Sequence, residues 1–478
     1  MPNFIIYKGK HKHSFRYKEG SLLIDVLRES GFLISAPCGG NGHCGKCLVK
    51  LNVNDKEEDV LACQTRVYDD CSVYLPDDSD IVSEGSSVKN ISDTINDYGV
   101  AIDLGTTTIE ISLVDLNDGK RICSNREWNL QRSYGADVIS RIDYCINNKD
   151  GLQTLSDLVR KQILDMIDRL CSIQGIDRDR ITRGFLAGNT VMQHIFCNID
   201  PGSIALAPFT PNCYFIDNET VNLENIPIRL SPCISGYVGG DIVSGLSALN
   251  LNKETILYID IGTNGEMAIG NSESLHTCSV ACGPAFEGAE ISCGMHATSG
   301  AISKVWVEEG RIAYETIDNT EVKGICGSGL IDMVASLLDL NYLDESGYLD
   351  EDIDENIFIN QMDIRKLQLA KAAIASGIKT LMNAVGLTYN DIDKLYIAGS
   401  FGNNLNLNSA ARIGMIPREL INKTILCGNN CLSGVEAELY KKEDNKLLNI
   451  KKISNYIELS SSKEFSDFFV EEMAFPEV

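Results

Sequence analysis

The stretch APCGGNGHCGKCLVKL, residues 36–51, places three cysteines within ten positions and surrounds them with four glycines. The spacing is Cys38-x5-Cys44-x2-Cys47, and a further cysteine, Cys63, follows in LACQ. Glycine lets a loop wrap closely around a buried group and turn its backbone N–H groups toward that group. The first 80 residues are therefore constrained to a small unit built around four thiols.

Three kinds of site could use these thiols. Disulfide frameworks belong to small secreted chains, whereas this chain has 478 residues and no signal-peptide pattern. Zinc sites usually have two CxxC-like pairs, and only one close pair is present. Plant-type 2Fe-2S centres use C-x4-C-x2-C and a distant fourth cysteine, which differs from this spacing by one residue. The pattern favours an iron–sulfur site, with zinc and structural thiols as alternatives and Cys71 as the rival to Cys63.

These residues resemble a 2Fe-2S ferredoxin domain with the longer first gap of adrenodoxin-like ferredoxins, over residues 1–80. The resemblance implies an α+β domain of the β-grasp type. In it the cluster is held by Cys38, Cys44, Cys47 and Cys63. The hydrophobic pattern predicts the following elements: a hairpin of 3–7 with 13–17, a helix at 22–27, strands at 48–53 and 72–75, and an acidic turn after residue 53.

After a polar linker at 81–98, strands and helices alternate as in α/β layers. Two segments in this region are similar, AIDLGTTTIEISLVDL at 101–116 and LYIDIGTNGEMAIGN at 257–271. In each, an Asp ends a hydrophobic strand and a Gly-Thr turn follows, so that amides and hydroxyls can hold phosphate while the carboxylate positions Mg²⁺. One such turn is common, but two in matching contexts indicate duplicated halves around a nucleotide. A third segment, LYIAGSFGNNL at 395–405, adds a Gly-rich turn after a strand.

This trio resembles the superfamily of acetate and sugar kinases, heat-shock ATPases and actin, in which two ribonuclease-H-like α/β lobes close on ATP. The resemblance implies lobes at 99–250 and 251–478, with Asp103 and Asp260 as the catalytic carboxylates. The other implied nucleotide contacts are Gly105, Thr106 and Thr107 in the first turn, Gly262, Thr263 and Asn264 in the second, and Gly399, Ser400, Phe401 and Gly402 in the adenosine segment. Ordinary turns in an unrelated α/β protein are the alternative.

A ferredoxin domain joined to a two-lobed ATPase resembles the reductive activators of corrinoid proteins. The segments that carry this match are GADVISRI (135–142), LAGNTVMQHIF (186–196), ISGYVGGDIV (234–243), ACGPAFEGAEISCGM (281–295) and GICGSGLIDMV (324–334). The match implies nucleotide contacts at Gly327, Ser328 and Gly329, and Asp241 is a weaker metal or phosphate candidate. Larger members of the family have an extra domain between the two parts. We expect this chain to be a short form that lacks that middle domain.

The implied function is ATP-dependent transfer of one electron from the 2Fe-2S cluster to an inactive Co(II) corrinoid protein, which regenerates Co(I). ATP and Mg²⁺ are the implied cofactors beside the cluster, the partner is a corrinoid protein, and a homodimer is compatible with the family; no electron donor is indicated. One alternative is activation of another low-potential metalloenzyme, such as a radical dehydratase or a double-cluster reductase. Another is a non-catalytic, nucleotide-gated redox sensor.

Charge and hydropathy exclude other classes of partner. The formal net charge of −25 argues against nucleic acid or an anionic membrane as the main partner. No run of 18 apolar residues is present, so we expect a cytoplasmic protein without a membrane span. Helices predicted at 152–170 and 366–385 have apolar stripes typical of core packing. The C-terminal segment, 451–478, mixes aromatic and acidic residues, and we expect it to pack on the second lobe.

Overall fold

The computed structural model describes residues 1–8, 11–32, 34, 42, 47–54, 56–75, 97–217, 219–288, 290–350, 359–399, 404–440 and 445–477. The chain divides into two compact units. The first unit contains Met1–Gly184, Val191–Cys213 and Thr220–Arg229, and the second contains Phe185–Thr190, Tyr214–Glu219 and Leu230–Val478. The domain boundaries expected from the sequence stay a prediction.

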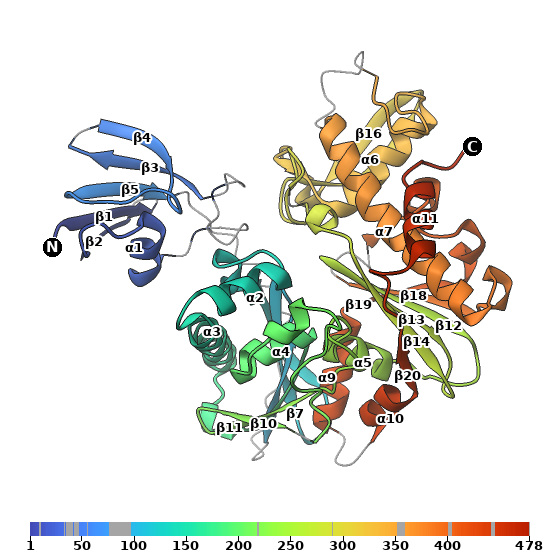
Figure 1. Ribbon diagram of the computed structural model, residues 1–478, viewed down its shortest axis with the longest axis horizontal. Coiled ribbons are helices and arrows are strands. Elements are labelled where there is room, and N and C mark those ends of the chain that lie inside the picture. Colours follow the sequence, from blue (N-terminus) through green and yellow to red (C-terminus); the bar gives the residue numbers. More distant parts are fainter. Residues whose placement is uncertain are drawn as a thin grey trace. The chain divides into compact units, whose positions relative to one another are not determined.

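The N-terminal residues form a five-stranded sheet in the order β2-β1-β5-β3-β4, with helix α1 against one face (Figure 1). The elements are β1 (Asn3–Lys8), β2 (His11–Arg16), α1 (Leu23–Glu29), β3 (Leu48–Val53), β4 (Lys56–Leu61) and β5 (Cys71–Leu75). β1 pairs antiparallel with β2 and parallel with β5. The predicted hairpin, helix and two strands are confirmed.

The expected acidic turn after residue 53 is wrong, because Lys56–Leu61 forms strand β4 at the edge of this sheet. Its first four residues, KEED, are exposed. Charged side chains on an edge strand prevent further strands from pairing with it, so a polar sequence can still be a strand there.

A second sheet has six strands in the order β10-β11-β9-β6-β7-β8. The strands are β6 (Tyr98–Leu104), β7 (Thr108–Asp115), β8 (Arg121–Trp128), β9 (Ile181–Gly188), β10 (Thr220–Leu223) and β11 (Ile226–Leu230). In β6 every residue except Asp103 is buried, as expected for a strand covered on both faces. This leaves the Asp103 carboxyl as the one chemically reactive side chain near the end of that strand.

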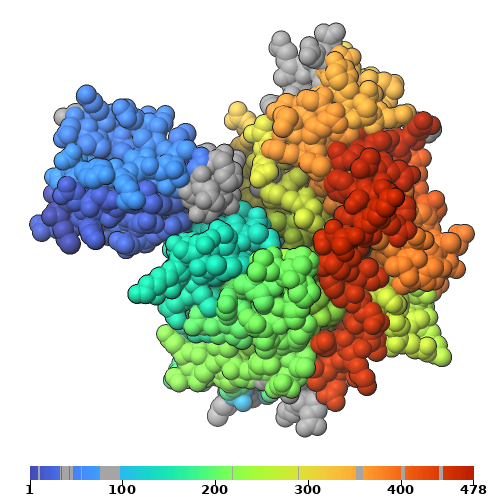
Figure 2. Space-filling model, viewed as in Figure 1, coloured from blue at the N-terminus to red at the C-terminus, as the bar shows by residue number. Residues whose placement is uncertain are grey.

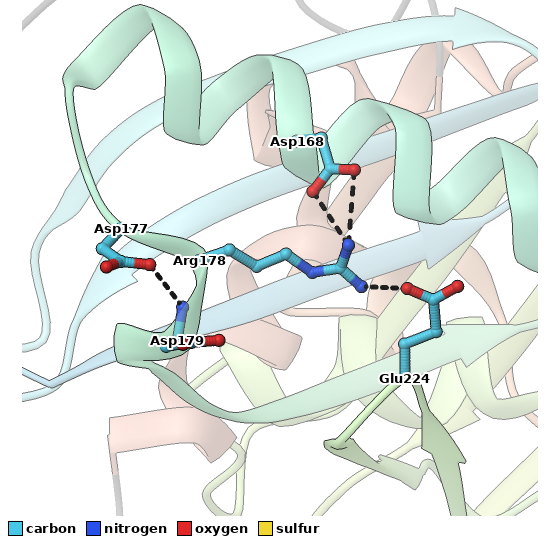
Figure 3. Close-up of polar contacts among 5 residues, drawn as sticks. All are labelled: Asp168, Asp177, Arg178, Asp179 and Glu224. Atoms are coloured by element: carbon cyan, nitrogen blue, oxygen red, sulfur yellow. Dashed lines mark hydrogen bonds and ion pairs between the residues drawn. The ribbon is translucent and has the colours of Figure 1, made fainter.

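The helices that accompany this sheet are α2 (Val138–Asn147), α3 (Gly151–Gln174) and α4 (Thr190–Cys197). α3 includes the helix predicted at 152–170, and most of its apolar stripe is fully buried. Just after α3, Arg178 contacts Asp168 at 3.1 Å and Glu224 at 2.8 Å, and so ties the helix to the turn between β10 and β11 (Figure 3).

The second unit contains a six-stranded sheet in the order β19-β18-β12-β13-β14-β20 and a three-stranded sheet in the order β16-β15-β17. The strands are β12 (Ile256–Ile261), β13 (Asn264–Gly270), β14 (Leu275–Ala281), β15 (Ala301–Glu308), β16 (Arg311–Thr316), β17 (Gly324–Ile325), β18 (Lys394–Gly399), β19 (Thr424–Gly428) and β20 (Ser454–Tyr456). The helices are α5 (Gly240–Ala248), α6 (Gly327–Asp339), α7 (Gln361–Val385), α8 (Leu407–Arg412), α9 (Asn430–Tyr440), α10 (Lys446–Ile453) and α11 (Lys463–Glu471). α7 contains the helix predicted at 366–385, and within the described ranges no helix is both long and apolar enough to cross a bilayer.

The C-terminal segment packs on α7, as expected (Figure 2). α11 lies against α7, and the chain beyond α11 continues into the core, where Phe475 is 2% exposed. Two buried side chains of α7 bind its backbone: Gln368 Nε2 donates to the Met473 carbonyl at 2.8 Å, and Lys371 Nζ donates to the Ala474 carbonyl. The second unit therefore includes residues almost to the end of the chain.

Candidate cluster and nucleotide sites

Two of the four predicted cluster cysteines lie together in the first unit. Cys47 precedes β3 and Cys63 follows β4, and because these strands pair, their ends place the two Sγ atoms 3.3 Å apart. Both side chains are buried, and neither forms a disulfide. Cys38 and Cys44 lie outside the described residues. Two adjacent buried thiols fit shared ligation of a thiophilic metal centre.

The alternative fourth ligand, Cys71, has a different environment. It lies in β5, where its Sγ is 4.0 Å from the Tyr17 hydroxyl. Burial raises the pKa of the Cys71 thiol to about 11, which opposes thiolate formation. The geometry therefore favours Cys63 over Cys71 as the partner of Cys47, and the full ligand set stays a prediction.

The first Gly-Thr turn, residues 105–107, joins β6 to β7, and hydrogen bonds from other segments to its carbonyls hold it in place. Asn129 Nδ2 donates to the Gly105 carbonyl at 2.9 Å, and the Asn129 backbone N–H donates to the Thr107 carbonyl at 2.9 Å. Arg141 Nη2 donates to the Thr106 carbonyl at 2.5 Å. All three carbonyls are thus bound by donors of the protein.

Arg141 is a fully buried cation beneath this turn. Besides Thr106 it binds the Gly135 carbonyl through Nε at 3.0 Å and the Gln131 side chain through Nη1 at 3.3 Å. Burial lowers the pKa of its guanidinium to about 9, so it stays charged at neutral pH. Arg141 lies in the segment GADVISRI, whose sequence indicates no role for it, because only the fold places Arg141 under residue 106.

The second turn, residues 262–263, joins β12 to β13 and is shorter. Asp260 faces Glu266 across this hairpin, and the turn closes on itself through the Gly262 N–H, which donates to the Asn264 carbonyl at 3.0 Å. Thr263 Oγ1 donates to the Glu287 carboxylate at 3.2 Å. The predicted duplication of a strand, an Asp and a Gly-Thr turn is therefore present in the structure as two antiparallel hairpins.

The adenosine segment begins beside the second turn. β18 runs parallel to β12, with Gly399 opposite Ile261. Gly399 has φ +110°, and a Cβ there would lie 2.2 Å from the Ile261 carbonyl, so only glycine fits. Ser400, Phe401 and Gly402 lie outside the described residues.

Three carboxyl groups gather near the second turn. Glu266 in β13 is only 7% exposed, and its Oε1 has no hydrogen-bond partner among the described residues. Burial, followed by the negative charges of Asp241 and Asp260, raises the pKa of Glu266 well above its ordinary value, while the Gly239 N–H opposes the shift. Asp241, in the first turn of α5, and Asp260 thus both act on the Glu266 carboxyl, and a metal or phosphate role for Asp241 stays a prediction. Within the described ranges no three His, Cys, Asp or Glu side chains are arranged to hold a metal ion.

Gly327, Ser328 and Gly329 start α6 and are all buried. A Cβ on Gly327 would lie 1.9 Å from the Phe286 carbonyl, and one on Gly329 would lie 2.2 Å from the Ile302 carbonyl. Ser328 Oγ donates to the Ser303 carbonyl at 3.0 Å. These contacts explain the Gly-Ser-Gly pattern by close backbone packing, and a nucleotide role for these residues stays a prediction.

Three family profiles cover most of the chain in succession. The 2Fe-2S iron-sulfur cluster binding domain matches residues 6–68, the RACo middle region matches 98–254, and the C-terminal domain of RACo, the ASKHA domain, matches 254–478. The expectation that the chain lacks the middle domain is wrong, since residues 98–254 match that region. Residues 98–254 include the first Gly-Thr turn, 105–107, which the sequence places in the expected ATPase lobe 99–250.

Individual relatives match along most or all of the chain. The corrinoid activation enzyme RamQ of Eubacterium limosum is 29% identical, over 94% of this chain and 95% of its own. The [Co(II) methylated amine-specific corrinoid protein] reductase of Methanosarcina barkeri is 26% identical, over 79% and 77%. A solved reductive activator for corrinoid, iron-sulfur protein is 29% identical with a TM-score of 0.74, over 100% and 98%. The chain therefore belongs to the RACo family, with a 2Fe-2S domain followed by the RACo middle region and the ASKHA domain.

Proposed function

We propose that this protein is an ATP-dependent reductive activator that passes one electron from a 2Fe-2S cluster to an inactive Co(II) corrinoid protein and so regenerates Co(I). The observation that carries the proposal is the order of the three matched regions, together with whole-length similarity to corrinoid activators. A cytoplasmic location and a homodimer are part of the proposal.

The electron carrier is the N-terminal sheet. Cys38, Cys44, Cys47 and Cys63 would hold the cluster, which when bound accepts and donates one electron at a time. The role of the protein is to exclude water from the sulfur atoms and to hold them close together. The 3.3 Å separation of Cys47 and Cys63 and the burial of both side chains support this role.

The two Gly-Thr turns would bind the nucleotide. In the first turn the three carbonyls are bound by Asn129 and Arg141, an arrangement that suits presentation of backbone N–H groups and threonine hydroxyls to phosphate. Asp103 and Asp260, each near the end of its strand, would position Mg²⁺ or its waters. The buried Arg141 charge favours an anion above the turn.

ATP is needed because electron transfer from an ordinary 2Fe-2S centre to Co(II) is unfavourable. For a one-electron step, a potential difference of about 59 mV corresponds to a tenfold change in the equilibrium constant. A nucleotide can shift such an equilibrium only if it binds two states of the activator with different affinity. We propose that nucleotide binding changes how the activator binds the corrinoid protein, and that this binding raises the reduction potential of the cobalt by altering its axial ligation.

The test uses the full chain purified without oxygen. Cys44→Ser should remove the visible 2Fe-2S bands, whereas Asp103→Asn should keep the bands and lower ATP-dependent reduction of a Co(II) corrinoid protein by about a hundredfold. A colourless, iron-free wild-type protein, or full activation by Asp103→Asn, would contradict the proposal. Stimulation of ATP hydrolysis by a radical dehydratase instead would identify the alternative partner, and no hydrolysis with either partner would indicate a redox sensor.

A further inference from the structure

Gln64 lies next to the predicted ligand Cys63 and contacts its sulfur. The turn after β4 is fixed by the Gln64 backbone N–H, which donates to the Leu61 carbonyl at 2.9 Å. The side chain then folds back, so that Nε2 lies 3.7 Å from Cys63 Sγ in donor geometry. Sulfur accepts hydrogen bonds at longer distances than oxygen because its radius is larger, so this contact is a direct N–H···S interaction.

The same side chain also contacts the loop that carries the other predicted ligands. Gly42 lies between Cys38 and Cys44 and has φ +79°. A Cβ at Gly42 would lie 3.0 Å from Gln64 Nε2 and 2.8 Å from its Cδ, and the latter distance is closer than real Cβ atoms approach. Glycine at 42 therefore leaves room for the side chain of Gln64. This contact places the amide beside the cysteine loop and the Cys63 sulfur together.

We propose that Gln64 is a positioning residue for electron transfer, whose amide donates to the Cys63 sulfur, packs against Gly42 and makes the bound cluster easier to reduce. The inference rests on the proposed function only in assuming that the four cysteines hold a 2Fe-2S cluster. Reduction adds one negative charge to the cluster, and part of that charge resides on the ligand sulfurs. An N–H donor to such a sulfur stabilises the reduced form and raises the reduction potential.

The experiment measures the potential of the cluster in the full-length protein, without nucleotide or corrinoid partner. Gln64→Met keeps the length of the side chain and loses the N–H, and Gln64→Ala loses both the donor and the packing. We expect both variants to retain the visible and EPR signals of the cluster and to show about a tenfold lower ratio of reduced to oxidised cluster at a fixed solution potential, a shift of ~59 mV.

The matched control is Thr65→Val, in the same turn. Thr65 Oγ1 donates to the Leu61 carbonyl at 2.9 Å and, among the described residues, donates to no sulfur atom, so its loss should leave the potential unchanged. A wild-type potential in both Gln64 variants overturns the inference, and so does a shift in Gln64→Ala alone, because packing would then explain it. Absence of a cluster from the wild-type protein overturns the proposed function instead, so the two failures are distinguishable.

Discussion

The two Gly-Thr turns share a sequence pattern, yet the protein holds them in different ways. The first, residues 105–107, has three residues whose carbonyls are all bound by donors from elsewhere in the first unit. The second, residues 262–263, has two residues and closes through its own Gly262 N–H. The buried ionisable groups at the two turns also differ, since Arg141 lies beneath the first turn and Glu266 lies beside the second.

This difference shows that a short motif specifies the chemistry it offers but not what keeps it in place. In the first hairpin the support is a cation and hydrogen bonds from neighbouring elements. In the second the support is the hairpin itself, beside a carboxyl whose pKa is raised by burial. Substitutions outside the motifs should therefore affect the two turns unequally, and the three predictions below use that inequality.

The largest effect is expected for Arg141→Met. Loss of the guanidinium removes the hydrogen bonds that Arg141 donates to the buried carbonyls of Thr106 and Gly135 and to the Gln131 side chain. Each buried acceptor left without a partner costs about 1–3 kcal/mol, so we expect the free energy of unfolding to fall by about 3–5 kcal/mol. Denaturant unfolding measures this loss, and isothermal titration should show weakened ATP binding.

Arg178→Met is the matched control for Arg141→Met. Arg178 lies in the same unit but makes partly exposed ion pairs with Asp168 and Glu224, which contribute about 1 kcal/mol or less. Equal losses of stability in the two variants would contradict the view that the first turn depends on a buried cation.

An intermediate effect is expected for a matched glycine pair. A Cβ on Gly105 would lie 2.7 Å from the Thr108 carbonyl, whereas one on Gly262 would have its nearest contact at 3.7 Å. Gly105→Ala should therefore cost about 1–3 kcal/mol of unfolding free energy, and Gly262→Ala should be nearly neutral. Thermal unfolding of the two variants, side by side, tests this difference, and a loss of stability only in Gly262→Ala would reverse the comparison.

The smallest effect is expected for Glu266→Gln, and it depends on pH. The pKa of Glu266 is raised in the folded protein, so the unfolded chain loses this proton at a lower pH than the folded protein does. The free energy of unfolding therefore falls as pH rises above 4.5. Glutamine removes this decrease. We expect the variant to be more stable than wild type at pH 7 and equal to it near pH 4.

The control for Glu266→Gln is Glu110→Gln, at the cross-strand position of Asp103 in the first hairpin. The Glu110 side chain is only half-buried, so its replacement should change the free energy of unfolding at pH 7 much less than Glu266→Gln does. A Glu266→Gln protein that is less stable than wild type at pH 7 would show that the ionised carboxylate is needed for the second turn.

Much of the fold could be predicted because its signals are local. The repeated pattern of a strand, an Asp and a Gly-Thr turn predicts both hairpins, and the apolar stripes predict α3 and α7. Strand β4 was missed because an edge strand can be polar. Its sequence then lacks the alternation of apolar and polar residues that would distinguish a strand from a turn.

The supporting residues of the site could not be predicted in this way. Asn129, Arg141 and Glu266 act through partners that lie up to 35 residues along the chain, or through burial, and neither is visible in a short motif. Gln64 is different, because its sulfur partner is the adjacent residue. Its second contact, with Gly42, depends on the folded loop.

The burial of Phe475 and the binding of the Met473 and Ala474 carbonyls by α7 have a consequence for synthesis on the ribosome. All five strands of the N-terminal sheet lie within the first 75 residues, so that part can fold while translation continues. The second unit cannot complete its core until residues 454–477 have emerged, because β20 and α11 belong to it. A nascent or prematurely terminated chain would therefore present a finished electron carrier beside an ATPase with an exposed apolar surface, the kind of species that chaperones bind.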